Sequence, residues 1–190
     1  MAIPVLFIKK KDSSLWLVQD YKTFNTVIVK NQYFLSLISE LVSKLQDAWY
    51  FTKLDVHWGF NNVHINSGDE WKTVFCTNCS LFKLLVIFFG MINSPIIFQT
   101  MMNDIFQNLL ADRIIIVYLD NILIFTQTLE NHQKAMCKVL KVLAKHKLFL
   151  CPRKYEFNKR QIKYLELVIS ENQVAINPIN SSVRVKNSRL

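Results

Sequence analysis

The fold is decided by residues 114–125, which have the sequence IIIVYLDNILIF. Two apolar runs, largely β-branched, meet at a polar pair, a pattern typical of a tight β-hairpin. The pattern predicts Asp120 and Asn121 at the tip. A carboxylate on such a tip suits metal binding, because paired strands fix its direction. The alternative, which the hairpin alone favours, is that the pair only makes the turn, since both residues tolerate a left-handed backbone.

Composition restricts the class of protein. The chain has 190 residues, enough for one domain or one and a half. Its hydrophobic fraction of 51% can supply a core, and a charged fraction of only 19% excludes a disordered chain. The net charge of +9 favours a polyanionic partner, nucleic acid first, although a merely basic soluble protein has the same charge.

Zinc, disulfide and membrane signals are weak. The chain has 4 Cys, and Cys76 and Cys79 form a C-x-x-C pair without a second pair at zinc-ligand spacing. The default is therefore a reducing compartment, cytoplasmic or nuclear. The longest apolar run, residues 84–92, is far shorter than the roughly 20 residues of a membrane span. Three lysines follow the apolar start, the reverse of a signal peptide, so neither a signal peptide nor membrane contact is expected.

Strand and helix patterns interleave without a regular βαβ rhythm. We expect helices from Ser39, from Ser94 and over 129–147, and strands at 5–8, 15–19, 49–56, 72–75, 84–88 and 163–169. This order predicts an α+β domain with an antiparallel sheet. Asp55 ends one of these strands. If that strand neighbours the hairpin, the carboxylates of Asp55 and Asp120 converge.

Several segments together resemble the reverse transcriptase of gypsy-type (Metaviridae) LTR retrotransposons. They keep the family's order and approximate spacing over about residues 3–178. The segments are PVLFIKKKD (4–12), QDY (19–21), YFTKLD (50–55), GDEWKT (68–73), FGMINSP (89–95), FQ (98–99), MND (102–104) and YLD (118–120).

The resemblance implies a right-hand polymerase fold. Residues 1–180 would form the reverse transcriptase domain, with fingers mainly at 1–50 and 61–93 and the palm in the remainder. The palm would be an antiparallel sheet backed by helices. Residues 181–190 no longer resemble the family. A thumb, a connection segment and RNase H are absent, so the chain is expected to be a truncated piece of a Pol polyprotein.

The resemblance also implies an RNA-directed DNA polymerase, a nucleotidyltransferase that adds dNTPs to a DNA primer on an RNA template. That chemistry uses two Mg²⁺ ions, with Mn²⁺ as a possible substitute, held by converging carboxylates. Asp55 and Asp120 are the implied metal ligands and catalytic residues. Asn121 stands where the family has a further Asp, which removes one negative charge from the site.

Other contacts carried over from the family concern the incoming nucleotide. Lys10 matches the fingers lysine at the triphosphate, and Trp16 stands where the family has an Arg that grips it. Phe60 matches the aromatic beside the sugar, and Phe89 and Gly90 match the segment under the base pair. Without the family, Lys10 would be part of a solvated basic turn and Phe60 a core residue.

Leu165 and Glu166 lie in the strand that resembles the primer grip, where Glu166 replaces a Gly and its carboxylate would repel a primer phosphate. Asp to Asn, Arg to Trp and Gly to Glu can each arise from one C-to-T or G-to-A transition. The sequence therefore favours a decayed retrotransposon copy with impaired activity. The rival hypotheses are a non-catalytic nucleic-acid-binding fragment and a transposon relic without a task.

Overall fold

The computed structural model divides the chain into two compact units, which are described separately. Unit 1 comprises residues 1–34 and 58–100, and unit 2 comprises residues 35–57 and 101–190. The helix expected from Ser39 lies outside the described residues. The structure describes residues 3–9, 13, 15–31, 45, 47–165, 167–171 and 173–176.

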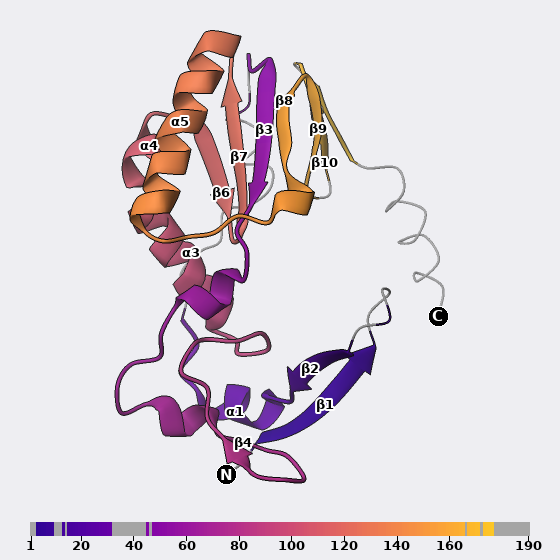
Figure 1. The fold of residues 1–190 in the computed structure, drawn as a ribbon, viewed down its shortest axis with the longest axis vertical. Helices are drawn as coiled ribbons and strands as arrows, with labels where there is room; N and C mark the ends of the chain where they lie inside the picture. Colours follow the sequence, from indigo (N-terminus) through magenta and orange to yellow (C-terminus); the bar gives the residue numbers. More distant parts are fainter. Residues whose placement is uncertain are drawn as a thin grey trace. The chain divides into compact units, whose positions relative to one another are not determined.

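A four-stranded sheet organises unit 1 (Figure 1). Its order is β2-β1-β4-β5, with β1 antiparallel to β2 and parallel to β4. The expected strands at 5–8 and 15–19 are confirmed as a hairpin. The strands are β1 (Ile3–Lys9), β2 (Leu15–Gln19), β4 (Phe75–Cys76) and β5 (Leu81–Phe82).

Short helices complete unit 1: α1 (Lys22–Val27) and the 3-10 helices η1 (Gly59–Asn62) and η2 (Glu70–Thr73). The expected strand at 84–88 is wrong, because that segment makes only an isolated bridge between His64 and Val86. The expected strand at 72–75 is largely η2, with β4 beginning at its last residue. Apolar composition alone did not distinguish these segments from strands.

Unit 2 is built on a second four-stranded sheet, of order β6-β7-β3-β8 and antiparallel throughout. This confirms the expected α+β class with an antiparallel sheet. In Figure 1, α5 lies against one face of the sheet. The strands are β3 (Tyr50–Asp55), β6 (Ile115–Tyr118), β7 (Asn121–Thr126) and β8 (Glu156–Lys159).

Both faces of this sheet are covered, which explains the continuous apolar runs in β6 and β7. One face, with Phe51 and Leu123, packs in a core cluster with Ile162 and Tyr164 of the next sheet. The other face carries Thr52, which hydrogen-bonds to α5. A strand buried on both faces needs apolar residues at every position rather than at alternate ones.

Helices α3 (Ser94–Ile105), α4 (Gln107–Ala111) and α5 (Leu129–Lys145) precede and follow the hairpin. The expected start at Ser94 is confirmed. Helix α5 begins where the Thr128 side chain accepts a hydrogen bond from the Asn131 N–H, satisfying one of the free donors of the first turn. Within the described part of the chain, no helix is both long and apolar enough to span a bilayer.

The last part of unit 2 is a three-stranded sheet of order β11-β10-β9. Its strands are β9 (Gln161–Tyr164), β10 (Leu167–Ser170) and β11 (Gln173–Ile176), and the 3-10 helix η3 (Pro152–Lys154) precedes β8. The single strand expected over 163–169 is wrong. The chain turns after Tyr164, where Leu165 takes a φ of 55°, and β10 returns antiparallel to β9.

The tip of the β6–β7 hairpin differs by one residue from the prediction. Tyr118 pairs with Asn121, so the two turn residues are Leu119 and Asp120 rather than Asp120 and Asn121. Leu119 has a φ of 53°, whereas two-residue hairpin turns favour Gly, Asn or Asp at such angles. An apolar side chain in this conformation carries backbone strain that the flanking strands must hold.

A buried histidine joins α5 to the sheet. His132 is fully buried, and its Nε2 and Nδ1 lie 2.7 and 3.1 Å from the hydroxyls of Thr52 and Thr126. The Thr126 hydroxyl donates to the carbonyl of Thr128, so it accepts from Nδ1–H. The neutral Nδ1–H tautomer therefore satisfies both hydroxyls, with Nε2 accepting from Thr52. Burial lowers the pKa of His132.

Acid is expected to destabilise the fold through His132. Its pKa in the folded chain is lowered, whereas the unfolded value is about 6.5, so its contribution is complete above that pH and is lost below it. Between about pH 8 and about pH 5.5 the loss reaches at most about 1.4 kcal/mol. Urea unfolding across this range measures it.

The control for this prediction is His146→Asn, at the exposed C-cap of α5, which should keep the pH dependence of the parent. His132→Asn should lower stability and flatten the dependence. Equal pH dependence in all three proteins would contradict the assignment of His132.

Candidate active site

The centre of the site is a pair of directly opposed residues on adjacent strands. Asp55 ends β3 and pairs with Asn121, the first residue of β7. Residues opposed in this way have Cβ atoms about 4.5–5.5 Å apart and point to the same face of the sheet. Asp55 is 7% exposed, so its carboxylate is held in a largely desolvated position.

Asp120 lies beside this pair, in the turn. Its backbone carbonyl accepts a hydrogen bond of 2.8 Å from the N–H of Val56, the residue after Asp55. Burial raises the pKa of Asp120, and the negative charge of Asp55 raises it further. Strands β3 and β7 are thus neighbours, and the two carboxylates are close enough to interact electrostatically.

Lys154 of η3 forms an ion pair with Asp55. The Lys154 ammonium donates to both carboxylate oxygens, at 3.1 and 3.0 Å, and the N–H of Cys151 donates to the Asp55 backbone carbonyl at 2.9 Å. The hydrogen bond to Asp55 is the main cause of a raised pKa of Lys154. Because the lysine side chain is 57% exposed, solvent weakens the ion pair, and the ammonium can move aside when another cation takes its place on Asp55.

Asn121 is tied to its neighbours on both sides. Its Nδ2 donates to Oδ1 of Asp120 at 3.0 Å, and its backbone carbonyl accepts from the Tyr164 hydroxyl at 3.2 Å. Burial raises the pKa of Tyr164, and the charge of Asp120 adds to the increase, so the phenol stays protonated and able to donate. The hydrogen bond from the Asn121 amide stabilises the charged form of the Asp120 carboxylate.

The donor set fits a hard divalent cation in part. Carboxylates are ligands that Mg²⁺ and Mn²⁺ accept, and Asp55 and Asp120 supply two neighbouring ones. Within the described ranges, no three His, Cys, Asp or Glu side chains converge into a metal-binding group. Asn121 offers an amide where a third carboxylate would complete such a group, so the residues suit one divalent ion better than two.

Unit 1 brings two of the predicted nucleotide contacts together. The ring of Phe60 is buried and meets the rings of Phe89 at 4.7 Å and Phe98 at 5.4 Å, both edge-on. Phe89 is 49% exposed, so this cluster has one solvent-facing ring. Gly90 has a φ of 99°, and a Cβ there would lie 3.2 Å from the Tyr21 ring.

The remaining predicted contacts are Lys10, Trp16, Leu165 and Glu166. Lys10 and Glu166 lie outside the described residues, as does the side chain of Trp16, whose backbone belongs to β2. Leu165 is described, and it packs against the core cluster of unit 2. The structure therefore supplies no geometry for these residues as nucleotide or primer contacts.

Sequence reasoning missed Lys154 and Tyr164. Lys154 lies 99 residues from Asp55 along the chain, and Tyr164 lies 43 from Asn121. The only available signal for Lys154 was its place in a Lys-Tyr-Glu-Phe box that matches a Lys-Cys-Glu-Phe box of the family. No spacing rule connects either residue to the hairpin.

Comparison with protein families matches residues 8–169 to "Reverse transcriptase (RNA-dependent DNA polymerase)". The chain belongs to the reverse transcriptase family. Among curated proteins, the Transposon Tf2-7 and Tf2-3 polyproteins of Schizosaccharomyces pombe are similar, at 35% and 34% identity over 90% of this chain. The chain spans only 13% of those polyproteins, so it corresponds to a reverse transcriptase domain within a much longer transposon protein.

Solved reverse transcriptases share the fold. The foamy viral protease-reverse transcriptase in complex with double-stranded DNA matches with a TM-score of 0.87 and 22% identity, over 100% of this chain and 33% of that one. The complex of the foamy viral enzyme with an RNA/DNA hybrid matches with a TM-score of 0.85 and 22% identity, over 98% and 25%. These matches confirm the polymerase fold expected for fingers and palm.

A carboxylate at position 121 should lower the stability of the reverse transcriptase domain when no divalent ion is present. Asn121→Asp places a negative charge opposite Asp55 and removes the amide donor to Asp120. Like charges directly opposed across a sheet are destabilising, and we expect a loss of about 1 kcal/mol. Urea unfolding in EDTA measures it, with Asn78→Asp on the exposed surface as the control. Equal stability of the two variants would contradict the geometry.

Proposed function

We propose that the chain is the fingers-and-palm part of a gypsy-type retrotransposon reverse transcriptase, an RNA-directed DNA polymerase by descent. The observation that carries this proposal is the pairing of Asp55 with Asn121, beside Asp120, at the ends of β3 and β7 in a chain of this family. The substrates would be an RNA template, a DNA primer and dNTPs. Solved relatives in complex with double-stranded DNA and with an RNA/DNA hybrid support the choice.

Asp55 and Asp120 would hold the divalent ion, Mg²⁺ or Mn²⁺. When bound, such an ion stabilises charge on the oxygens that attack and leave during nucleotide transfer. The chain's own contribution is position, because β3 holds Asp55 and the turn between β6 and β7 holds Asp120 before any ligand arrives. Because Asn121 is neutral, we infer that the site binds one divalent ion strongly. The second ion of the two-metal mechanism would be bound only weakly.

Lys154 would act as the counter-ion of Asp55 when no divalent ion is bound. The ammonium satisfies a carboxylate that is only 10% exposed, whose charge would otherwise be buried without a partner. Binding of a divalent ion requires Lys154 to move aside. The half-exposed lysine can do so, because solvent can take up its charge.

The nucleotide and primer contacts remain predictions from the family. Phe60 would lie beside the sugar, Phe89 and Gly90 under the base pair, and Lys10 at the triphosphate. Trp16 would leave the triphosphate without the Arg that the family uses there. An indole offers one donor and no charge, whereas guanidinium offers a charged fork.

Impaired activity follows from three substitutions. By resemblance to the family, Asn121 would remove charge from the metal site, Trp16 would remove charge from the nucleotide site, and Glu166 would repel the primer. Each matches a single C-to-T or G-to-A transition, which supports a decayed copy. The gene's codons test this: a requirement for two changes at position 121 or 16 would argue against decay.

A non-catalytic nucleic-acid-binding fragment is the alternative function. The net charge of +9 and the ion pair that occupies Asp55 both favour it. The third possibility is a transposon relic that has no selected function.

Primer extension on an RNA template distinguishes these possibilities. We expect the parent chain to be nearly silent with Mg²⁺ and more active with Mn²⁺. Asn121→Asp should raise extension by about 10²-fold, the size of one lost electrostatic contact to a transition state. Adding Trp16→Arg should raise it further.

The control for primer extension is Asp55→Asn on the Asn121→Asp background, which must abolish any gain. Strong extension by the parent would show that two carboxylates suffice. Silence in the repaired variants, with nucleic-acid binding retained, would favour the non-catalytic function.

A further inference from the structure

Helix α5 carries a line of lysines on its solvent side. Successive residues of an α-helix are about 100° apart, so Lys134, Lys138, Lys141 and Lys145 fall within an arc of about 60°. All four are exposed. The buried residues of the helix lie on the opposite side and are His132, Ala135, Val139 and Leu143.

Interactions within the helix explain the presence of only two of these four lysines. Lys134 pairs with Glu130 at 2.6 Å, and Lys145 lies in the last turn, where the helix dipole favours a cation. Lys138 and Lys141 have no acidic residue three or four positions away, and like charges at these spacings destabilise a helix. Their charge is therefore unexplained by the helix itself.

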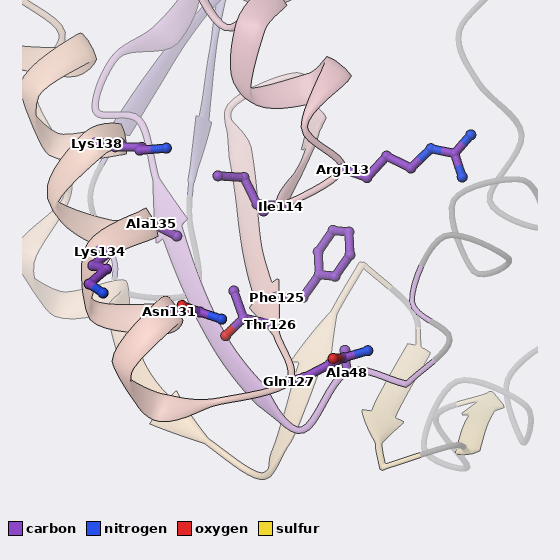
Figure 2. Close-up of a pocket in the computed structure, with 10 residues that line it drawn as sticks. All are labelled: Ala48, Arg113, Ile114, Phe125, Thr126, Gln127, Asn131, Lys134, Ala135 and Lys138. Atoms are coloured by element: carbon purple, nitrogen blue, oxygen red, sulfur yellow. The ribbon is translucent and has the colours of Figure 1, made fainter.

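A basic pocket continues the line (Figure 2). It has a volume of about 560 Å³, and its cationic residues are Arg113, Lys134 and Lys138. None of the ten labelled lining residues is a carboxylate, and the apolar part includes Ile114 and Phe125. No described carboxylate forms an ion pair with Arg113, Lys138, Lys141 or Lys145.

The lysines of α5 lie on the opposite side of the sheet from the carboxylate pair. His132 of α5 bonds to Thr52, and side chains alternate along β3, so Thr52 and Asp55 point to opposite faces. A ligand on the lysines of α5 would therefore not lie against Asp55.

We propose that the α5 basic surface, defined as Arg113, Lys134, Lys138, Lys141 and Lys145, binds the phosphate backbone of a single nucleic-acid strand. The rise from Lys134 to Lys145 is about 16 Å, the length of about five nucleotides. Lysine ammonium groups are mobile point charges, which suit phosphates but do not read bases. The chain also belongs to a family of nucleic-acid polymerases, which favours a phosphate backbone over an acidic protein as the occupant.

The test compares two triple variants of equal charge in binding to single-stranded RNA, in EDTA. The first is Lys138→Gln with Lys141→Gln and Lys145→Gln, and the control is Lys30→Gln with Lys83→Gln and Lys159→Gln, all exposed. Each phosphate contact contributes about 0.7 to the slope of log affinity against log salt, so the first variant should lose about 2 and the control much less. Lysine acetylation footprinting should show protection of the α5 lysines by the RNA.

Equal slopes in the two triple variants, or unprotected α5 lysines, would overturn the proposal. Loss of binding to polyglutamate by the first variant, with RNA binding unchanged, would instead assign the surface to an acidic protein. Since the assay contains no metal and no dNTP, its result is independent of whether the chain polymerises. Thermal melting of both triple variants verifies that each is folded.

Discussion

The antiparallel register of β3 on β7 is the constraint on which the site depends. It places Asp55 opposite Asn121 and brings the turn residue Asp120 alongside, with the Val56 N–H bonded to the Asp120 carbonyl. A slip of one residue would turn Asp55 to the helix face, among apolar side chains, where a carboxylate is costly. The register is protected because both faces of β7 are buried, so any slip would disturb two cores at once.

Charge balance explains how two neighbouring acidic residues are held at this site. Asp55 is nearly buried and would be unstable alone, and Lys154 supplies its counter-charge from η3. Asn121 relieves the repulsion that a further carboxylate would add, and its amide bonds to Asp120. Under the function proposed above, the same features would weaken the polymerase site, because both reduce the negative charge available to divalent ions. Stability and catalysis would then be opposed at position 121.

The sequence predicted the elements with strong local signals and missed those set by tertiary contacts. Two β-branched apolar runs that meet at a polar pair located the β6–β7 hairpin, and Ser94 before a proline located the start of α3. The hairpin tip lies one residue before its predicted position because Leu119 has a positive φ, a conformation that is not expected for a leucine. The strand expected over 163–169 divides at Leu165 for the same reason.

Only those residues of the candidate site that lie in sequence motifs could be predicted from the sequence. Asp55, Asp120 and Asn121 lie in such motifs, whereas the distant partners Lys154 and Tyr164 are brought in by folding. The α5 basic surface was also not predicted, because a helical lysine pattern acquires meaning only once the buried side of the helix is known.

The central claim is that Asp55 and Asp120 form a site for one divalent ion. When no such ion is bound, the Lys154 ammonium is the counter-ion of Asp55. Anomalous diffraction from crystals of the chain soaked in Mn²⁺ tests it most directly. The account predicts one strong peak about 2.0–2.5 Å from oxygens of both carboxylates, with the Lys154 ammonium displaced from Asp55. A crystal that shows no peak at the pair, with Lys154 still bonded to Asp55, would contradict the account.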